Sequence, residues 1–152
     1  MKFIKAKLRK LFSQETSTEN IGQPSDENIS LTVALAKNFV QEISSSYSGW
    51  ESAYLRIEAT EESIGCRISC KLPHQVELLD VLQHKPFTRT VMEIGAKLRE
   101  QVPQNGKKFI VLLIVIESNF NYEIQYEYEN SNRWAITKLG GGTGIPEGYR
   151  PA

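Results

Sequence analysis

Four side chains have the chemical types needed for zinc binding or for a nucleophile with its base: Cys66, Cys70, His74 and His84. The cysteines are four residues apart in CRISCKL, which alternates like a strand, so their side chains share one face about 13 Å apart. That distance is too long for a disulfide or for joint binding of one zinc ion. We therefore expect two buried free thiols in a reducing cytosol and no metal site.

The other groups that could support catalysis lack the surroundings that a reaction needs. Glu61 with Glu62, or Glu127 with Glu129, could be paired as a general acid and a general base, but no sequence neighbour distinguishes the two roles. The glycine run GGGTG could approach a phosphate, yet prolines follow it in place of the helix that a phosphate loop requires. We expect a protein that is not an enzyme and binds no cofactor.

The segment NYEIQYEYEN, 121–130, alternates with the period of a strand. One face would carry Tyr122, Ile124, Tyr126 and Tyr128, and the other Glu123, Gln125, Glu127 and Glu129. Same-face carboxylates about 7 Å apart repel by only about 0.6 kcal/mol in water, so an exposed acidic face costs little. Such a face could discourage aggregation, or it could attract a basic protein partner.

The first ten residues, MKFIKAKLRK, contain five cations and no acid, although the whole chain has 18 basic and 18 acidic residues. The pattern predicts a basic amphipathic helix at 1–12, either touching a membrane surface or an acidic partner, or docked with solvated cations. No uninterrupted apolar core follows, so we expect neither a secretory signal nor a transmembrane segment, and a cytoplasmic location. Residues 1–24 would form this arm with a polar linker, and 25–152 a single domain.

Hydrophobic periodicity predicts an α+β domain, in which two main amphipathic helices pack on an antiparallel sheet of about four to five strands. The predicted order is a helix at 25–47, strands at 50–59 and 66–72, an ambiguous segment at 74–85, a helix at 86–102, and strands at 108–118 and 121–129. The ambiguous segment could be a helix, a strand or an irregular crossover. The almost wholly apolar 108–118 should be the central strand. RWAITKL, 133–139, could add a short strand before an irregular Gly-rich tail.

Several of these segments carry a family resemblance between about 39 and 149. They are WESAYLRIEA opened by Trp50, CRISCKL after Gly65, KLREQVPQNGK, FIVLLIVIES, and NYEIQYEYEN followed by Trp134. Together they resemble the YezG-like family of bacterial immunity proteins, which neutralise toxin domains, often nucleases, delivered between competing cells. The basic arm and the neutral overall charge depart from that pattern.

The resemblance implies an immunity protein of a contact-dependent growth inhibition system, which binds a cognate toxin domain and occludes its active site. It would bind no nucleic acid directly. The charge pattern suggests partner contacts at Tyr54, Glu58, Glu123, Glu127 and Glu129, and a reversal of the last three glutamates should slow association without disturbing the fold. The alternative is a secretion chaperone or adaptor that holds a client or a membrane with the basic arm. The toxin's identity and the oligomeric state stay open.

Overall fold

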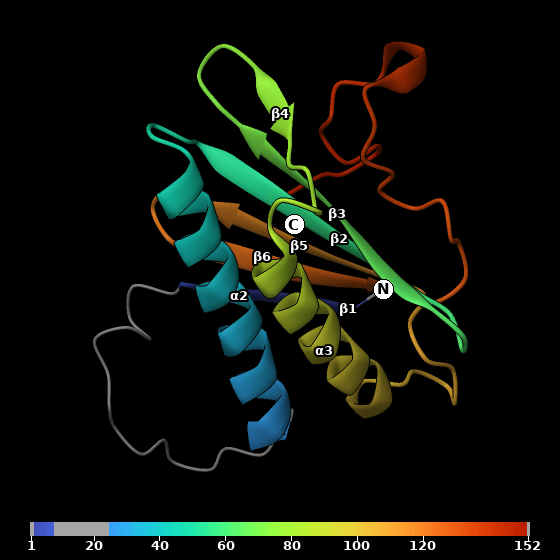
Figure 1. The fold of residues 1–152 in the computed structure, drawn as a ribbon. Helices are drawn as coiled ribbons and strands as arrows, with labels where there is room; N and C mark the ends of the chain where they lie inside the picture. The colour runs from blue at the N-terminus through green and yellow to red at the C-terminus, as the bar shows by residue number, and fades with distance from the viewer. Residues whose placement is uncertain (1, 8–24, 152) are drawn as a thin grey trace.

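The computed structural model describes residues 25–151 and the backbone of 2–7. Six antiparallel strands form one sheet in the order β1-β6-β5-β2-β3-β4, and two helices lie side by side on one face (Figure 1). The strands are β1 (Lys2–Lys7), β2 (Ser52–Ala59), β3 (Ile64–Lys71), β4 (Val76–Leu78), β5 (Val111–Glu117) and β6 (Asn121–Glu127). The helices are α2 (Asp26–Ser46) and α3 (Lys85–Gln101), with a short 3-10 helix at Leu139–Gly141. The predicted α+β class and element order are confirmed.

Both helices begin at the signals present in the sequence. The hydroxyl of Ser25 accepts a hydrogen bond from the backbone N–H of Asn28 and so caps α2. Pro86 stands in the first turn of α3, where its missing N–H costs nothing. The rings of Phe39 and Phe87 stack with centroids 6.0 Å apart and join the two helices over the sheet.

Strand β5 is buried on both faces, as its apolar sequence predicts. Its even-numbered residues face the helices and share the main core with Tyr122, Ile124 and Tyr126 of β6. Its odd-numbered residues, Val111, Leu113 and Val115, belong to a second apolar cluster on the opposite face. The sheet therefore needs a cover on the face that carries no helix.

The segment after β6 supplies that cover. It runs across the helix-free side of the sheet (Figure 1), and its apolar side chains there are Trp134, Ile136, Ile145 and Tyr149. The sequence left open a short strand at 133–139, and the segment forms none there. It crosses the face of the sheet and does not pair with an edge. The Gly-rich tail is irregular, as expected, but it is packed: a Cβ on Gly142 would lie 2.3 Å from the carbonyl oxygen of Thr137.

The expected N-terminal helix is wrong for residues 2–7, which form β1. The backbone of β1 pairs antiparallel with β6, with Lys2 opposite Tyr126 and Lys7 opposite Asn121. A short isolated helix is marginal in water, whereas the outer edge of β6 offers a row of backbone hydrogen-bonding groups. This strand raises the count to six, against the four to five expected. The rest of the predicted arm and linker, 8–24, lies outside the described residues.

The ambiguous segment 74–85 contains a strand. Val76–Leu78 form β4, which pairs antiparallel with Ser69–Lys71 at the end of β3. A turn then leads into α3. Strand β4 is shorter than β3, so it covers only part of that strand's outer edge.

Replacing Trp134 with alanine should lower the free energy of unfolding by about 3–5 kcal/mol, because the indole is 1% exposed in the second apolar cluster. Leu139→Ala, at a side chain that is 84% exposed in the same segment, should change it by less than about 0.5 kcal/mol. Urea denaturation of both variants measures the difference. Equal stabilities would contradict a packed cover on this face.

Candidate functional site

Two of the five predicted contact residues are buried. Tyr54 and Glu123 are each 6% exposed, because both lie on the sheet face that the C-terminal segment covers. The alternation of β6 is as predicted, but its acidic face is an interior face over much of the strand. A reversal of Glu123 to lysine would therefore disturb the fold, contrary to the expectation from the sequence.

Tyr149 of the C-terminal segment contacts both of these buried residues. Its hydroxyl donates to Oε2 of Glu123 at 3.4 Å, and its ring meets that of Tyr54 edge-on with centroids 6.0 Å apart. Burial, together with the negative charge of Glu123, raises the pKa of Tyr149, so the phenol stays protonated. The side-chain amide of Gln125 donates to the other oxygen of Glu123. Glu123 thus serves an internal hydrogen-bond network.

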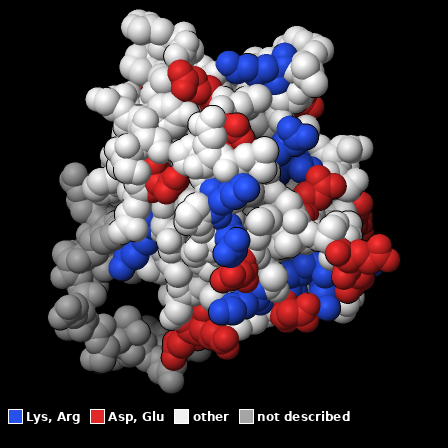
Figure 2. Space-filling view, viewed as in Figure 1, with Lys and Arg blue, Asp and Glu red and all other residues white. Residues whose placement is uncertain are grey.

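The three remaining predicted contacts line two different hollows, one with Glu58 and the other with Glu127 and Glu129. Glu58 is exposed on β2 and accepts a hydrogen bond from Arg56 at 2.8 Å. Glu127 is half-buried at the end of β6, and Glu129 is exposed and lies 3.5 Å from the Lys107 ammonium. The exposed acidic face expected from the sequence is therefore wrong for the middle of β6, where Glu123 and Gln125 are buried. On the helix-bearing face, acidic and basic side chains are interspersed (Figure 2).

Arg56 is a buried cation that ties the C-terminal segment to the sheet. Its Nε donates to the carbonyl oxygen of Arg133 at 2.9 Å, and its Nη2 donates to that of Ser131. Its Nη1 donates to Glu58, and the guanidinium is thus hydrogen-bonded on three sides. Arg67 is the cross-strand partner of Arg56 on β3, but its side chain is exposed.

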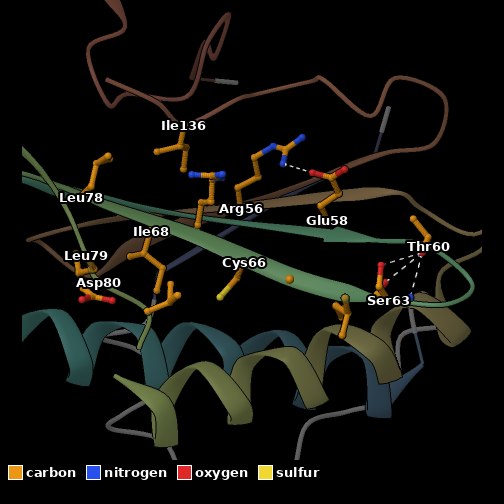
Figure 3. A pocket seen from close by; sticks show the side chains of 14 residues that line it. Arg56, Glu58, Thr60, Ser63, Cys66, Ile68, Leu78, Leu79, Asp80 and Ile136 are labelled. Carbon is orange, nitrogen blue, oxygen red and sulfur yellow. Dashed lines mark hydrogen bonds and ion pairs between the residues drawn. The ribbon is translucent and has the colours of Figure 1, made fainter. Parts of the chain in front are cut away.

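A groove of about 590 Å³ follows the outer edge of β3 next to the chain that leaves β4. Leu78, Ile136, Arg56 and Glu58 lie on its helix-free side, and Cys66, Leu79 and Asp80 lie on the side nearer the helices (Figure 3). The groove therefore combines apolar and charged side chains from β2, β3, the end of β4 and the C-terminal segment. It is larger than the hollows beside Tyr149 and beside Glu129, which measure about 340 and 290 Å³.

The floor of this groove is a backbone edge. Strand β4 pairs only as far back as Ser69, and one more bond runs from the N–H of Leu79 to the carbonyl oxygen of Ile68. The N–H and C=O groups of successive residues point to opposite edges of a strand. In β3, the backbone groups of even-numbered residues therefore point away from β2, as those of Ile68 do. The amide groups of Ile64 and Cys66 therefore face the groove beyond the reach of β4.

The two cysteines are free, as predicted, and Cys70 is buried while Cys66 is half-buried beside the groove. Burial raises the pKa of Cys66 to about 11 and that of Cys70 to about 12. A nucleophilic cysteine needs the opposite shift, because the thiolate is the reactive form. Neither thiol has the properties of a catalytic nucleophile.

The two histidines lie in different places and have different surroundings. His84 precedes α3, and its Nδ1 is hydrogen-bonded to Glu42 of α2, while His74 is exposed in the turn before β4. Within the described part of the chain, no three histidine, cysteine or acidic side chains are grouped closely enough to hold a metal ion. In the same part, neither helix has the length and apolar character needed to cross a membrane.

Comparison with known proteins gives no match, either to a family model or to a curated protein. The resemblance to YezG-like immunity proteins consequently stays a prediction.

Sequence reasoning missed the groove and the pairing of Arg56 with Arg67. The signal was present in part: Thr60–Ser63 is a polar turn between two alternating strands, and that turn length places Arg56 opposite Arg67. The early departure of β4 from β3 had no such signal, because it depends on where α3 packs.

Replacing Arg56 with methionine should destabilise the protein by about 2–4 kcal/mol, because the carbonyls of Ser131 and Arg133 lose their donors. Arg67→Met is the matched control on the neighbouring strand and should cost less than about 0.5 kcal/mol. Thermal and urea unfolding would compare the two. A larger loss at Arg67 would contradict this assignment of the buried cation.

Alkylation of Cys66 by iodoacetamide at pH 8 should be about a hundred times slower than that of an unperturbed thiol, because a pKa of about 11 instead of 9.0 leaves so little thiolate. The rate should rise about tenfold per pH unit until the pH approaches that pKa. Mass spectrometry of a Cys70→Ala variant isolates the Cys66 signal. A rate at pH 8 equal to that of free cysteine would refute the raised pKa.

Proposed function

We propose that this chain is a cytoplasmic immunity protein that binds a cognate toxin domain, such as a nuclease, and occludes its active site. The family resemblance of the segments between 39 and 149 suggests this class. The observation that carries the proposal is the groove along β3, where outward-facing backbone groups lie between charged and apolar side chains. Such a surface is suited to holding a segment of another protein.

The mechanism is inhibition by binding, with no turnover. The toxin domain would contact the rim of the groove, where Glu58 is the predicted contact residue that fits best, since it is exposed and belongs to the lining. Burying Leu78, which is 41% exposed, would add apolar contact area. Glu127 and Glu129 lie by another hollow, at the end of β6, and could steer a basic partner without entering the groove.

The alternative function, a chaperone or adaptor that uses the basic arm, gains less support from the fold. It would require residues 1–12 to be available to a client or a membrane surface. The backbone of Lys2–Lys7 instead pairs with β6 along the length of that strand. This pairing favours a role for residues 2–7 in building the sheet.

The gene immediately upstream is the one to inspect, and a variable carboxy-terminal region of a large protein encoded there would be the toxin candidate. Its expression in a bacterial host should arrest growth, and co-expression of this chain should restore growth through a complex that copurifies. Glu58→Lys should weaken the complex about tenfold, whereas Glu147→Lys, an exposed change on the C-terminal segment, should leave it unchanged.

Growth arrest that persists despite equal amounts of both proteins would overturn the proposal. Protection by a chain that does not bind the toxin domain would overturn occlusion as the mechanism.

A further inference from the structure

The outer edge of β3 offers a short run of hydrogen-bonding groups that the fold leaves open. The backbone amides of Ile64 and Cys66 point into the groove, and pairing by the chain itself stops at the bond between Leu79 and Ile68. The available edge is therefore about four residues long. Open strand edges of this kind accept another extended chain.

The side chains beside this edge differ on its two sides. On the helix-free side, Arg67 is exposed and has no ion-pair partner among residues 25–151, and a Cβ at Gly65 would have nothing within 4 Å. On the side nearer the helices, Cys66, Ile64 and Val81 make the lining mainly apolar. A bound strand would place alternate side chains into these two environments.

We propose that an extended segment of a partner protein pairs antiparallel with Ile64–Arg67 and adds a strand to the sheet in this groove. From its amino to its carboxyl end, the segment carries a carboxylate opposite Arg67, an apolar residue opposite Cys66 and an aromatic residue over Gly65. The inference rests on the proposed function only in that the partner is a protein.

Each part of this pattern follows from a local requirement. A carboxylate neutralises the exposed guanidinium of Arg67. An apolar side chain next to Cys66 removes further apolar surface from water. An aromatic ring can lie over Gly65, because no side chain of β3 occupies that space. Antiparallel pairing matches every other strand pair of this sheet.

A second copy of this chain fits the edge less well. Symmetric antiparallel pairing about Cys66 would place Gly65 of one copy opposite Arg67 of the other. Both arginines would then lack a carboxylate, and neither glycine would be covered by an aromatic ring. The chemistry of the edge therefore favours a different protein.

The test uses a displayed library of random peptides, selected on the immobilised full-length protein. Cys66→Pro removes the outward N–H, while the bonds from β3 to β2 come from its odd-numbered residues and are kept. Cys66→Val keeps the N–H and is the matched control. Selected peptides should carry the acidic, apolar and aromatic order, and should bind the proline variant at least about tenfold more weakly than the valine variant.

Ile64→Pro provides a second way to block the edge, at the first residue of the strand, where proline is tolerated best. Circular dichroism and thermal unfolding would establish that each tested variant is folded. Arg67→Ala should weaken binding of the acidic peptides selectively, compared with versions that carry glutamine at the same position.

Three results would overturn the proposal: no enriched peptide, enriched peptides that bind both proline variants as tightly as the valine variant, or a concentration-dependent dimer that Cys66→Pro dissolves. The last result would assign the edge to a second copy. Failure of the proposed function would appear separately, as persistent growth arrest in the presence of the toxin domain.

Discussion

Burial of β5 on both faces is the constraint on which the rest of the molecule depends. Two helices cover one face, and the chain after β6 must cover the other, because Val111, Leu113 and Val115 would otherwise meet water. Because the cover lies over this face, Glu123 is buried, and Tyr149 and Gln125 donate hydrogen bonds to its carboxylate. The cover is in turn held to the sheet by the buried guanidinium of Arg56, which donates to the carbonyl oxygens of Ser131 and Arg133.

Local sequence signals predicted the elements that depend on local physics. Hydrophobic periodicity predicted the helices at 25–47 and 86–102, the apolar run predicted β5, and the alternation of β6 identified its core face. The cover and β1 escaped prediction because they depend on distant partners. Trp134 and Tyr149 follow no helical or strand period, and the pairing of Lys2–Lys7 depends on an edge more than a hundred residues away.

The same distant contacts explain why the predicted contact residues were only partly placed on the surface. An alternating acidic strand is read as exposed unless something covers it, and nothing in β6 itself indicates the C-terminal segment. The groove arises in a comparable way: β4 ends after three residues as the chain turns toward α3, and the edge of β3 is left open beyond Ile68. Its capacity to bind follows from backbone geometry, which no catalytic motif would reveal.

The central claim is that the open edge of β3 receives the protein partner. Amide hydrogen exchange of this chain, alone and with a toxin domain that it protects against in the growth test, tests the claim most directly. The account predicts slowed exchange at Ile64 and Cys66 on binding, with little change in β1 and β6. Unchanged exchange at the β3 edge, with protection at another surface of a tight complex, would contradict it.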